Sequence, residues 1–386
     1  MENVLFGIDS FCQQAGTYKN TRFALVTNNA ATTSDGTAGR IALLRAGFNI
    51  IKLFSPEHGL TAKGDDGIYQ HHHIDTLTQL PVISLYGDHL LPSEEEMTGI
   101  DCVLFDIPDV GCRFYTYLWT MTYTMESCAK FNKPFIVLDR PNPAGGDLRR
   151  SEGPMLDERN CSSFIGRWNI PLRHCCTLGE LAGFFAATRI KDADLQVTKL
   201  HNWKRKQTVA EAGWRFVPPS PAIRDPETVL LYPCTGLLEG INVHEGRGTE
   251  WPFKILGAPW MDAQEITRAF TDLQLPGIKS TAIDYTAGRG LYEGEHCYGL
   301  QLSLTDTQRF EPVKTGIALL QLIVSLYPEE CKERLYPTVA NPSGARHLDK
   351  LTGMYQSFGK LKKGNALSTE PGQKDWAAII EPYLLY

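Results

Sequence analysis

The chain has 386 residues, of which 42% are hydrophobic and 21% charged, and its formal net charge is −6. A chain of this length can form two domains, because a single hydrophobic core rarely grows beyond about 250–300 residues. The negative net charge gives no basic surface for nucleic acid and no cationic face for a membrane, and no apolar segment approaches the roughly 18–20 residues of a membrane span.

The first half of the sequence alternates short apolar runs with amphipathic segments. Residues 22–27 form one apolar run, and a helical pattern from about 37 to 46 leads to a second run at 49–54. Near-continuous apolar strands that alternate with helices are typical of a parallel sheet covered on both faces. We therefore predict an α/β protein with a Rossmann-like, doubly wound, mainly parallel sheet. Its further elements are expected as strands at 81–86, 101–107 and 134–139 and a helix between 116 and 129.

The second half begins with one more helix and strand of the same kind. Thr177 and Glu180 form a capping box that predicts a helix over 178–188, and a strand follows at 195–200. The proline-rich stretch VPPSPAIRDP at 217–226 then marks the end of the doubly wound part. Glycine-rich loops, a strand near 298–304 and a helix at 312–326 predict a smaller α+β C-terminal domain. The predicted domains are a catalytic domain, 1–225, and a smaller domain that closes the active-site cleft, 226–386.

Familiar signatures of cofactor and metal sites are missing from the sequence. Asn28-Asn29 follows the first strand in place of a GxGxxG dinucleotide fingerprint, and no GxxxxGK[ST] phosphate loop occurs. The ten cysteines contain no CxxC pair. The consecutive histidines at 71–73 would point to alternating sides of an extended segment, so they cannot readily share one metal ion. We expect no cofactor and no metal.

Polar residues cluster where several predicted strands end. In open parallel sheets, ligands bind in the crevice beyond the carboxyl ends of the strands. Any one of these residues could simply cap a turn, but four clusters at one edge of a sheet favour a functional crevice. The first cluster is Glu57-His58, in the stretch FSPEHGL that follows the strand at 49–54. The other candidates are Asn28, Asp106, Asp109, Arg113, Asp139, Arg140 and Asn142.

The residue types in these clusters fit a site for sugars. Glycoside hydrolysis needs one carboxyl group as the general acid and usually a second as base or nucleophile. A glutamic acid that is desolvated in a turn can stay protonated and act as that acid. Arg113, Arg140 or Arg247 could bind a substrate carboxylate through paired hydrogen bonds. Aromatic side chains near the same strand end, such as Tyr115, could stack against sugar rings.

Several long stretches together resemble the NamZ-type exo-β-N-acetylmuramidases. They include FSPEHG at 54–59, VLFDIPDVGCRFYTYLWTM at 103–121, VLDRPNPAGG at 137–146 and LLEGINVHEGRGTEWPF at 237–253. They run in the order of that family and cover most of the chain. The resemblance implies a Rossmann-like domain, a smaller C-terminal domain and an active site between the two. It also implies the release of N-acetylmuramic acid from the non-reducing end of peptidoglycan-derived oligosaccharides or muropeptides.

The resemblance further implies a role for the FSPEHGL stretch. The Glu of the SPEHG motif is the catalytic carboxylate favoured for the family, and that position is Glu57 here. We predict that Glu57 is the general acid and that His58 adjusts its ionisation and orientation. The second carboxyl group is expected to be Asp106 or Asp109, which would orient water or stabilise positive charge at the anomeric carbon.

The C-terminal part contributes a second set of candidates. Residues 246–249, which end at Thr249, are expected to reach over the cleft, with Glu245 beside them as another possible second carboxyl group, as is Asp139. Muramic acid carries a lactyl carboxylate that N-acetylglucosamine lacks, so a muramidase should own a cationic group for it. The sequence does not rank Arg113, Arg140 and Arg247 for that role.

Two alternative functions remain open at this point, together with the cellular location. The same cleft could belong to a non-catalytic muropeptide-binding or sugar-binding module, or to a β-N-acetylglucosaminidase. The sequence also departs from the family's usual pattern at Pro108 and at Cys175-Cys176, which could alter subsites. The start, MENVLFGIDSF, has no signal-peptide pattern, and the scattered cysteines favour a reducing compartment. We therefore expect a cytoplasmic protein; the alternative is an exported or periplasmic protein whose signal was removed.

Overall fold

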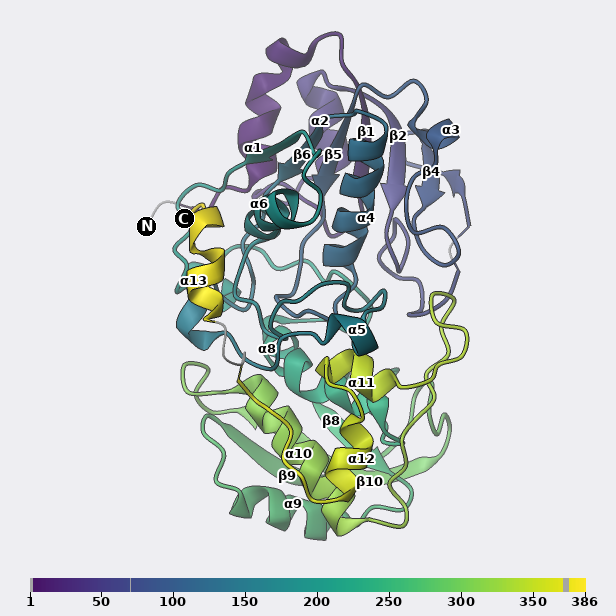
Figure 1. Cartoon of the computed structure of the whole chain (residues 1–386), viewed down its shortest axis with the longest axis vertical. Helices are drawn as coiled ribbons and strands as arrows, with labels where there is room; N and C mark the ends of the chain where they lie inside the picture. Colours follow the sequence, from purple (N-terminus) through teal and green to yellow (C-terminus); the bar gives the residue numbers. More distant parts are fainter. Residues whose placement is uncertain (1–2, 70, 371–374) are drawn as a thin grey trace.

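A seven-stranded sheet organises the N-terminal part of the molecule (Figure 1). The computed structural model describes residues 3–69, 71–370 and 375–386. The strands lie in the order β3-β4-β2-β1-β5-β6-β7, and within the described residues β3 alone runs antiparallel to its neighbour. This confirms the predicted doubly wound, mainly parallel sheet. Its strands are β1 (Arg22–Thr27), β2 (Asn49–Ser55), β3 (His73–Ile74), β4 (Pro81–Ser84), β5 (Cys102–Asp106), β6 (Phe135–Leu138) and β7 (Leu195–Thr198).

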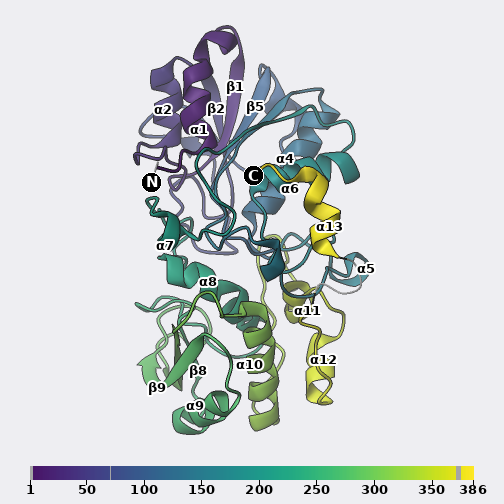
Figure 2. The same ribbon diagram turned by 90° about the vertical axis from the view of Figure 1, so that its left-hand side faces the viewer.

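Apolar residues on both faces of the strands explain why this sheet is covered on both sides. Successive side chains of a strand point to opposite faces. In β1, Phe23 and Leu25 join one apolar core, while Ala24 and Val26 join another. Figure 2 shows α1 and α2 on one side of the sheet and α4 and α6 on the other. The helices of this unit are α1 (Gly7–Phe11), α2 (Gly39–Ala46), α3 (Glu94–Met97), α4 (Tyr117–Lys130), α5 (Glu158–Cys161), α6 (Leu178–Thr188) and α7 (Val209–Ala212).

The capping box predicted from the sequence sets the start of α6. The Thr177 side chain accepts a hydrogen bond from the Glu180 backbone N–H at 3.2 Å, and the Thr177 N–H donates to the Glu180 carboxylate at 3.0 Å. The helix then runs over Leu178–Thr188, as predicted. Among the described residues, four short 3₁₀ helices also occur, namely η1 (Cys12–Tyr18), η2 (Leu148–Arg150), η3 (Gly236–Gly240) and η4 (Glu381–Tyr383).

A smaller antiparallel sheet forms the second unit, below the first in Figure 1. Its order is β8-β10-β9, and α9 and α10 pack beside it, which confirms the predicted α+β domain. Pro226 and Pro312 occupy the first turns of α8 and α10, where a missing N–H costs no hydrogen bond. No helix in the described residues is both long and apolar enough to cross a membrane. The elements are α8 (Pro226–Thr235), β8 (Ile255–Ala258), α9 (Ala263–Asp272), β9 (Ile278–Thr286), β10 (His296–Leu304), α10 (Pro312–Leu326), α11 (His347–Thr352) and α12 (Ser357–Lys362).

The last residues of the chain return to the first unit. After α12, helix α13 (Trp376–Ile380) lies beside α6, as the yellow segment in Figures 1 and 2 shows. The Trp376 indole donates a hydrogen bond to the His174 carbonyl oxygen at 2.9 Å and packs against Phe184. The predicted boundary at residue 225 separates the two sheets, but residues 375–386 pack against the seven-stranded one.

Asp139, a predicted site residue at the end of β6, holds this arrangement together. Its buried carboxylate accepts four hydrogen bonds of 2.7–2.9 Å, which come from the Arg140 and Gly179 backbone and from the Thr177 and Tyr386 hydroxyls. Burial raises the pKa of Asp139 to about 6, although the Tyr386 and Thr177 hydroxyls oppose that rise. The carboxylate thus joins β6, the start of α6 and the end of the chain.

This raised pKa predicts a pH dependence of stability that Asp139→Asn should remove. The folded protein binds a proton at Asp139 at a pH where the unfolded chain has already lost it, so the contribution of Asp139 to stability increases as pH falls from about 7 to about 5. Urea unfolding midpoints should therefore rise for the wild type relative to Asp139→Asn over that range, by an amount equivalent to roughly 1–3 kcal/mol. Asp192→Asn, at an exposed position, is the control. Parallel pH profiles for the wild type and Asp139→Asn would contradict the prediction.

Candidate active site

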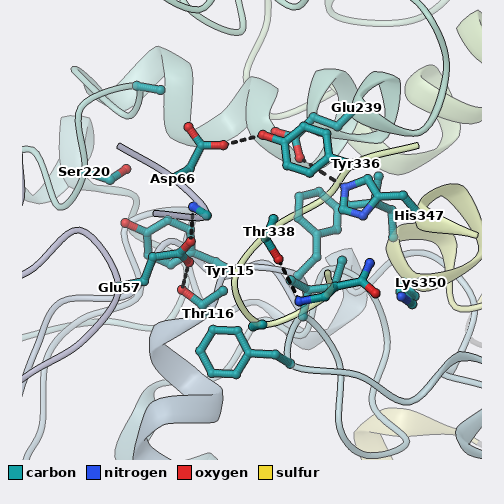
Figure 3. Close-up of a pocket in the computed structure, with 18 of the residues that line it drawn as sticks. Glu57, Asp66, Tyr115, Thr116, Ser220, Glu239, Tyr336, Thr338, His347 and Lys350 are labelled. Atoms are coloured by element: carbon teal, nitrogen blue, oxygen red, sulfur yellow. Dashed lines mark hydrogen bonds and ion pairs between the residues drawn. The ribbon is translucent and has the colours of Figure 1, made fainter. Parts of the chain in front are cut away.

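A pocket of roughly 790 Å³ lies between the two units (Figure 3). Glu57, Asp66 and Thr116 line it from the loops after β2 and β5, at the carboxyl ends of the parallel strands. Arg247 and Lys350 line it from the second unit. The pocket therefore lies where the strand-end rule predicts a ligand. The rule does not predict the wall that the second unit contributes.

A tight turn places Glu57 in the pocket. The strand β2 ends at Ser55, and the backbone then turns through His58 and Gly59, which have positive φ angles of 67° and 70°. Glu57 is buried, with 7% of its surface exposed. The Gly67 backbone N–H donates to Glu57 Oε1 at 2.8 Å, and the Thr116 hydroxyl lies 2.8 Å from Oε2. Both carboxyl oxygens are thus fixed, and the turn is rigidly tied to α4 through Thr116.

The two partners of Glu57 differ in what they allow. A backbone N–H can only donate, so Oε1 has to accept and stays unprotonated. A hydroxyl can donate or accept, so the Thr116 hydroxyl can rotate and accept a hydrogen bond from a proton on Oε2. Tyr86 also borders Glu57, and burial together with the Glu57 charge raises the pKa of the Tyr86 phenol. Of the Gly67 and Thr116 contacts, only the one at Oε2 is therefore compatible with a proton on that oxygen.

His58 acts on the turn through the backbone. Its Nδ1 lies 2.8 Å from the Gly64 carbonyl oxygen, and its ring packs edge-on against Tyr117. Within the described residues no hydrogen bond joins the imidazole to the Glu57 carboxylate. The side chain therefore closes the loop that follows Glu57, and the predicted adjustment of Glu57 by His58 stays a prediction.

Two carboxylates that sequence reasoning missed also line the pocket, Asp66 from the loop that contains Glu57, and Glu239 from the second unit. Asp66 binds Arg247 at 3.0 Å and the Tyr336 hydroxyl, and Glu239 binds Arg247 at 2.5 Å. Burial acts to raise the pKa of Asp66, but Arg247 and Tyr336 outweigh it and hold that pKa below its ordinary value. For Glu239, Arg247 and His347 likewise outweigh burial and lower the pKa. Both groups are therefore held ionised.

Arg247 is the predicted site residue that links these groups. It also binds Glu245 at 2.7 Å, so one guanidinium serves three carboxylates. Glu245 is buried, lies outside the pocket lining and meets Arg334 at 3.6 Å. Thr249 also lies outside the lining, where its hydroxyl donates to the Gly246 carbonyl oxygen at 2.7 Å and shapes the loop. The segment 246–249 does reach the cleft, and it does so through Arg247.

The predicted strand-end residues fall into two groups. The structure brings Glu57, His58 and Tyr115 together in the pocket lining, with Arg247 facing them. Others hold the loops of the N-terminal unit. Asn28 accepts from the Ala30 backbone N–H at 3.0 Å, and Asn142 donates to the Cys176 carbonyl oxygen at 3.0 Å.

Asp106, Asp109 and Arg140 lie outside this pocket. Arg140 Nε donates to Asp106 Oδ1 at 2.6 Å, in a pair that is almost wholly buried, and burial raises the pKa of Asp106 against the effect of Arg140. Asp109 faces the buried His174 at 3.4 Å. Asp109 and Arg140 line a separate, smaller pocket of roughly 410 Å³. This geometry does not bring the two predicted second carboxyl groups to Glu57.

Arg113 is fully buried and contacts both units. Its guanidinium donates to the carbonyl oxygens of Pro154, Ile170 and Leu351, at 2.7, 2.9 and 3.1 Å. Burial lowers the pKa of Arg113 to about 10, and no carboxylate among the described residues pairs with it. A side chain used in this way stabilises the packing of the two units and is closed to a substrate.

Some of the pocket residues that sequence reasoning missed could have been found from their position in the sequence, and others could not. Thr116 directly precedes α4, at the strand end already singled out, and Asp66 follows Glu57 within the same loop. Both would have been included if the search beyond the strand ends had covered more of each following loop. Glu239 lies within the stretch at 237–253 that carries the family resemblance, so that stretch was a signal for it. Tyr336, His347 and Lys350 also come from the second unit, and no local pattern marks them. The described residues contain no group of three or more His, Cys, Asp or Glu side chains placed to hold a metal ion.

Comparisons with known proteins identify the family of the chain. The family model described as "Exo-beta-N-acetylmuramidase NamZ, N-terminal" matches residues 23–227, and that described as "Exo-beta-N-acetylmuramidase NamZ, C-terminal" matches residues 230–386. The chain is 42% identical over 374 residues to the peptidoglycan β-N-acetylmuramidase NamZ of Bacillus subtilis (strain 168), which covers 95% of this chain and 87% of that protein.

Two crystal structures of DUF1343 family proteins from Bacteroides fragilis share the fold. One has a TM-score of 0.84 at 28% identity, and the other has a TM-score of 0.74 at 27% identity. Each comparison covers 100% of this chain and 99% of the other. The similarity therefore extends over both units and the cleft between them.

The contact between Thr116 and Glu57 predicts the effect of Thr116→Val. Valine keeps the shape of threonine but leaves Glu57 Oε2 without its partner, which should lower kcat by about 10-fold or more on a chromogenic β-N-acetylmuramide, the substrate class that the resemblance implies. Thr124→Val is the matched control, because Thr124 is a buried threonine on α4 whose hydroxyl binds the Thr120 carbonyl oxygen instead of Glu57. Equal losses in both variants would show that the effect comes from helix packing.

Proposed function

Since the chain belongs to the NamZ family of exo-β-N-acetylmuramidases, we propose that it releases N-acetylmuramic acid from the non-reducing end of peptidoglycan-derived sugars, with Glu57 as the general acid. The observation that carries the proposal is the fixing of Glu57 between the Gly67 N–H and the Thr116 hydroxyl, in a pocket between the two units.

In the proposed reaction, Glu57 protonates the leaving oxygen. The proton moves from Glu57 Oε2 to the glycosidic oxygen, the bond from that oxygen to the anomeric carbon breaks, and the sugar ring develops positive charge. Thr116 and Gly67 then hold the resulting carboxylate, since both can donate to it. The same carboxylate can later accept a proton from the incoming water, so that the enzyme returns to its starting state.

Asp66 supplies the second carboxyl group in this proposal. Glycosidases separate the roles of two carboxyl groups by giving them different surroundings. Asp66 is held ionised by Arg247 and Tyr336, and 27% of its side chain remains exposed towards the pocket. Asp66, Glu239 and Glu245 all bind Arg247, and one guanidinium cannot neutralise three carboxylates. These residues together therefore keep a negative charge. That charge would stabilise the positively charged transition state.

Glu57→Gln tests the role of the general acid. The variant keeps the shape of the side chain but cannot transfer a proton, so kcat for a chromogenic β-N-acetylmuramide should fall by about 10²- to 10⁴-fold. Binding of N-acetylmuramic acid should change little. Glu250→Gln is the matched control, because Glu250 is exposed and lies outside the pocket lining.

The same assay decides between the enzymatic alternatives. A β-N-acetylglucosaminide should be cleaved far more slowly than the muramide by the wild type. A wild-type enzyme that prefers the glucosaminide would contradict the proposed specificity. A Glu57→Gln variant with undiminished turnover of the muramide would remove Glu57 from the chemistry.

Asp66→Asn tests the role of the second carboxyl group, and Asp65→Asn serves as its control. Removing the Asp66 charge should lower kcat by about 10²-fold, because the transition state loses a counter-charge. Asp65→Asn removes the same charge one residue earlier, where Asp65 forms a surface ion pair with Arg289, and it should leave kcat near the wild-type value. Thermal unfolding of both variants checks that the loop stays folded. Similar kcat values for the two variants would contradict the role of Asp66.

A further inference from the structure

The pocket is lined by two side chains with permanent positive charge, and only one of them is neutralised. Among the described residues that form the lining, these are Arg247 and Lys350. Arg247 binds Asp66, Glu239 and Glu245 and has no free side for a substrate carboxylate. Lys350 makes no ion pair with any described residue. The charge of Lys350 is therefore available to a ligand.

The helix α11 directs Lys350 into the pocket. His347, Lys350 and Leu351 are spaced three and four residues apart, which places them on one face of the helix, and all three line the pocket. In Figure 3, Lys350 lies on the side of His347 and Thr338, across the pocket from Glu57. Burial lowers the pKa of Lys350, and the nearby Arg346 lowers it further. The ammonium group is thus partly desolvated without an ion-pair partner among the described residues.

Two other donors in the lining also lack partners. Asn341 Nδ2 and Ser163 Oγ are buried, and within the described part of the chain neither makes a hydrogen bond. Buried polar groups normally have a partner, and a group without one is often completed by a ligand. An ammonium group, an amide N–H and a hydroxyl can each donate a hydrogen bond to a carboxylate. The lining therefore offers unsatisfied donors of the kind that bind an anionic oxygen pair.

We propose that Lys350 binds the lactyl carboxylate of the terminal N-acetylmuramic acid and so gives the enzyme its preference over N-acetylglucosamine. This inference rests on the proposed muramidase function. It replaces the expectation of an arginine for this role, because Arg113 is buried in backbone contacts, Arg140 lies outside the pocket and Arg247 is saturated by carboxylates. Lys350 selects the substrate and takes no part in proton transfer.

The test compares Lys350→Met with Lys350→Arg on two substrates. For Lys350→Met, kcat/KM on a chromogenic β-N-acetylmuramide should fall by about 10- to 100-fold, mainly through KM, because an ion-pair partner of the substrate is lost. Turnover of the matching β-N-acetylglucosaminide, which has no lactyl group, should be unchanged within about 2-fold. Lys350→Arg keeps the charge and should recover a large part of the activity.

A ligand series separates charge from shape. N-acetylmuramic acid should inhibit the wild type more strongly than its methyl ester, and Lys350→Met should bind the two equally. Lys363→Met is the matched control, because Lys363 is exposed and lies outside the catalytic pocket, and it should behave as the wild type. Thermal unfolding of each variant shows whether a loss of activity comes from misfolding.

The outcomes distinguish this inference from the proposed function. A wild-type enzyme that cleaves the muramide, together with a Lys350→Met variant of unchanged KM and unchanged preference, would overturn the role of Lys350 and leave the muramidase proposal intact. A wild type that cleaves neither substrate would overturn the proposed function itself. In that case calorimetry with N-acetylmuramic acid still decides the role of Lys350, since equal affinity of the wild type and Lys350→Met would refute it.

Discussion

The shared contacts of Arg247 are the interaction on which the site depends. Arg247 follows Glu245 in the second unit, and Asp66 belongs to the loop that begins with Glu57 in the first. The guanidinium thus fixes the distance between the two walls of the pocket. It also supplies the charge that keeps Asp66 and Glu239 ionised although burial acts to raise the pKa of both. The spacing of the pocket walls and the ionisation of Asp66 and Glu239 therefore both depend on Arg247.

The sheet was predictable because its signal is local. Strands that are buried on both faces must be apolar at nearly every position, and β5 and β6 are buried throughout. The rule fails for β3, which has two exposed residues at the sheet edge, and for β9, whose burial alternates irregularly. In such strands the pairing partner, which lies elsewhere in the chain, decides the structure.

The site was predictable in part, for a related reason. The strand-end rule found Glu57, but it treats all carboxylates at that edge alike. Asp139 differs from Glu57 only in what faces it, namely the first turn of α6 and the Tyr386 hydroxyl instead of a cavity. The residues of the facing wall, such as His347, follow hundreds of positions later, and their placement depends on how the two units pack. Local sequence carries no trace of that packing.

The return of residues 375–386 to the seven-stranded sheet affects how the protein forms during synthesis. The buried carboxylate of Asp139 receives one of its four hydrogen bonds from Tyr386, and Trp376 packs against α6. Domains usually fold in order as they leave the ribosome. Here the first unit lacks part of its packing until this last segment has emerged, by which time the whole second unit is available. The two units should therefore mature together, with the first held incomplete while the second is being translated.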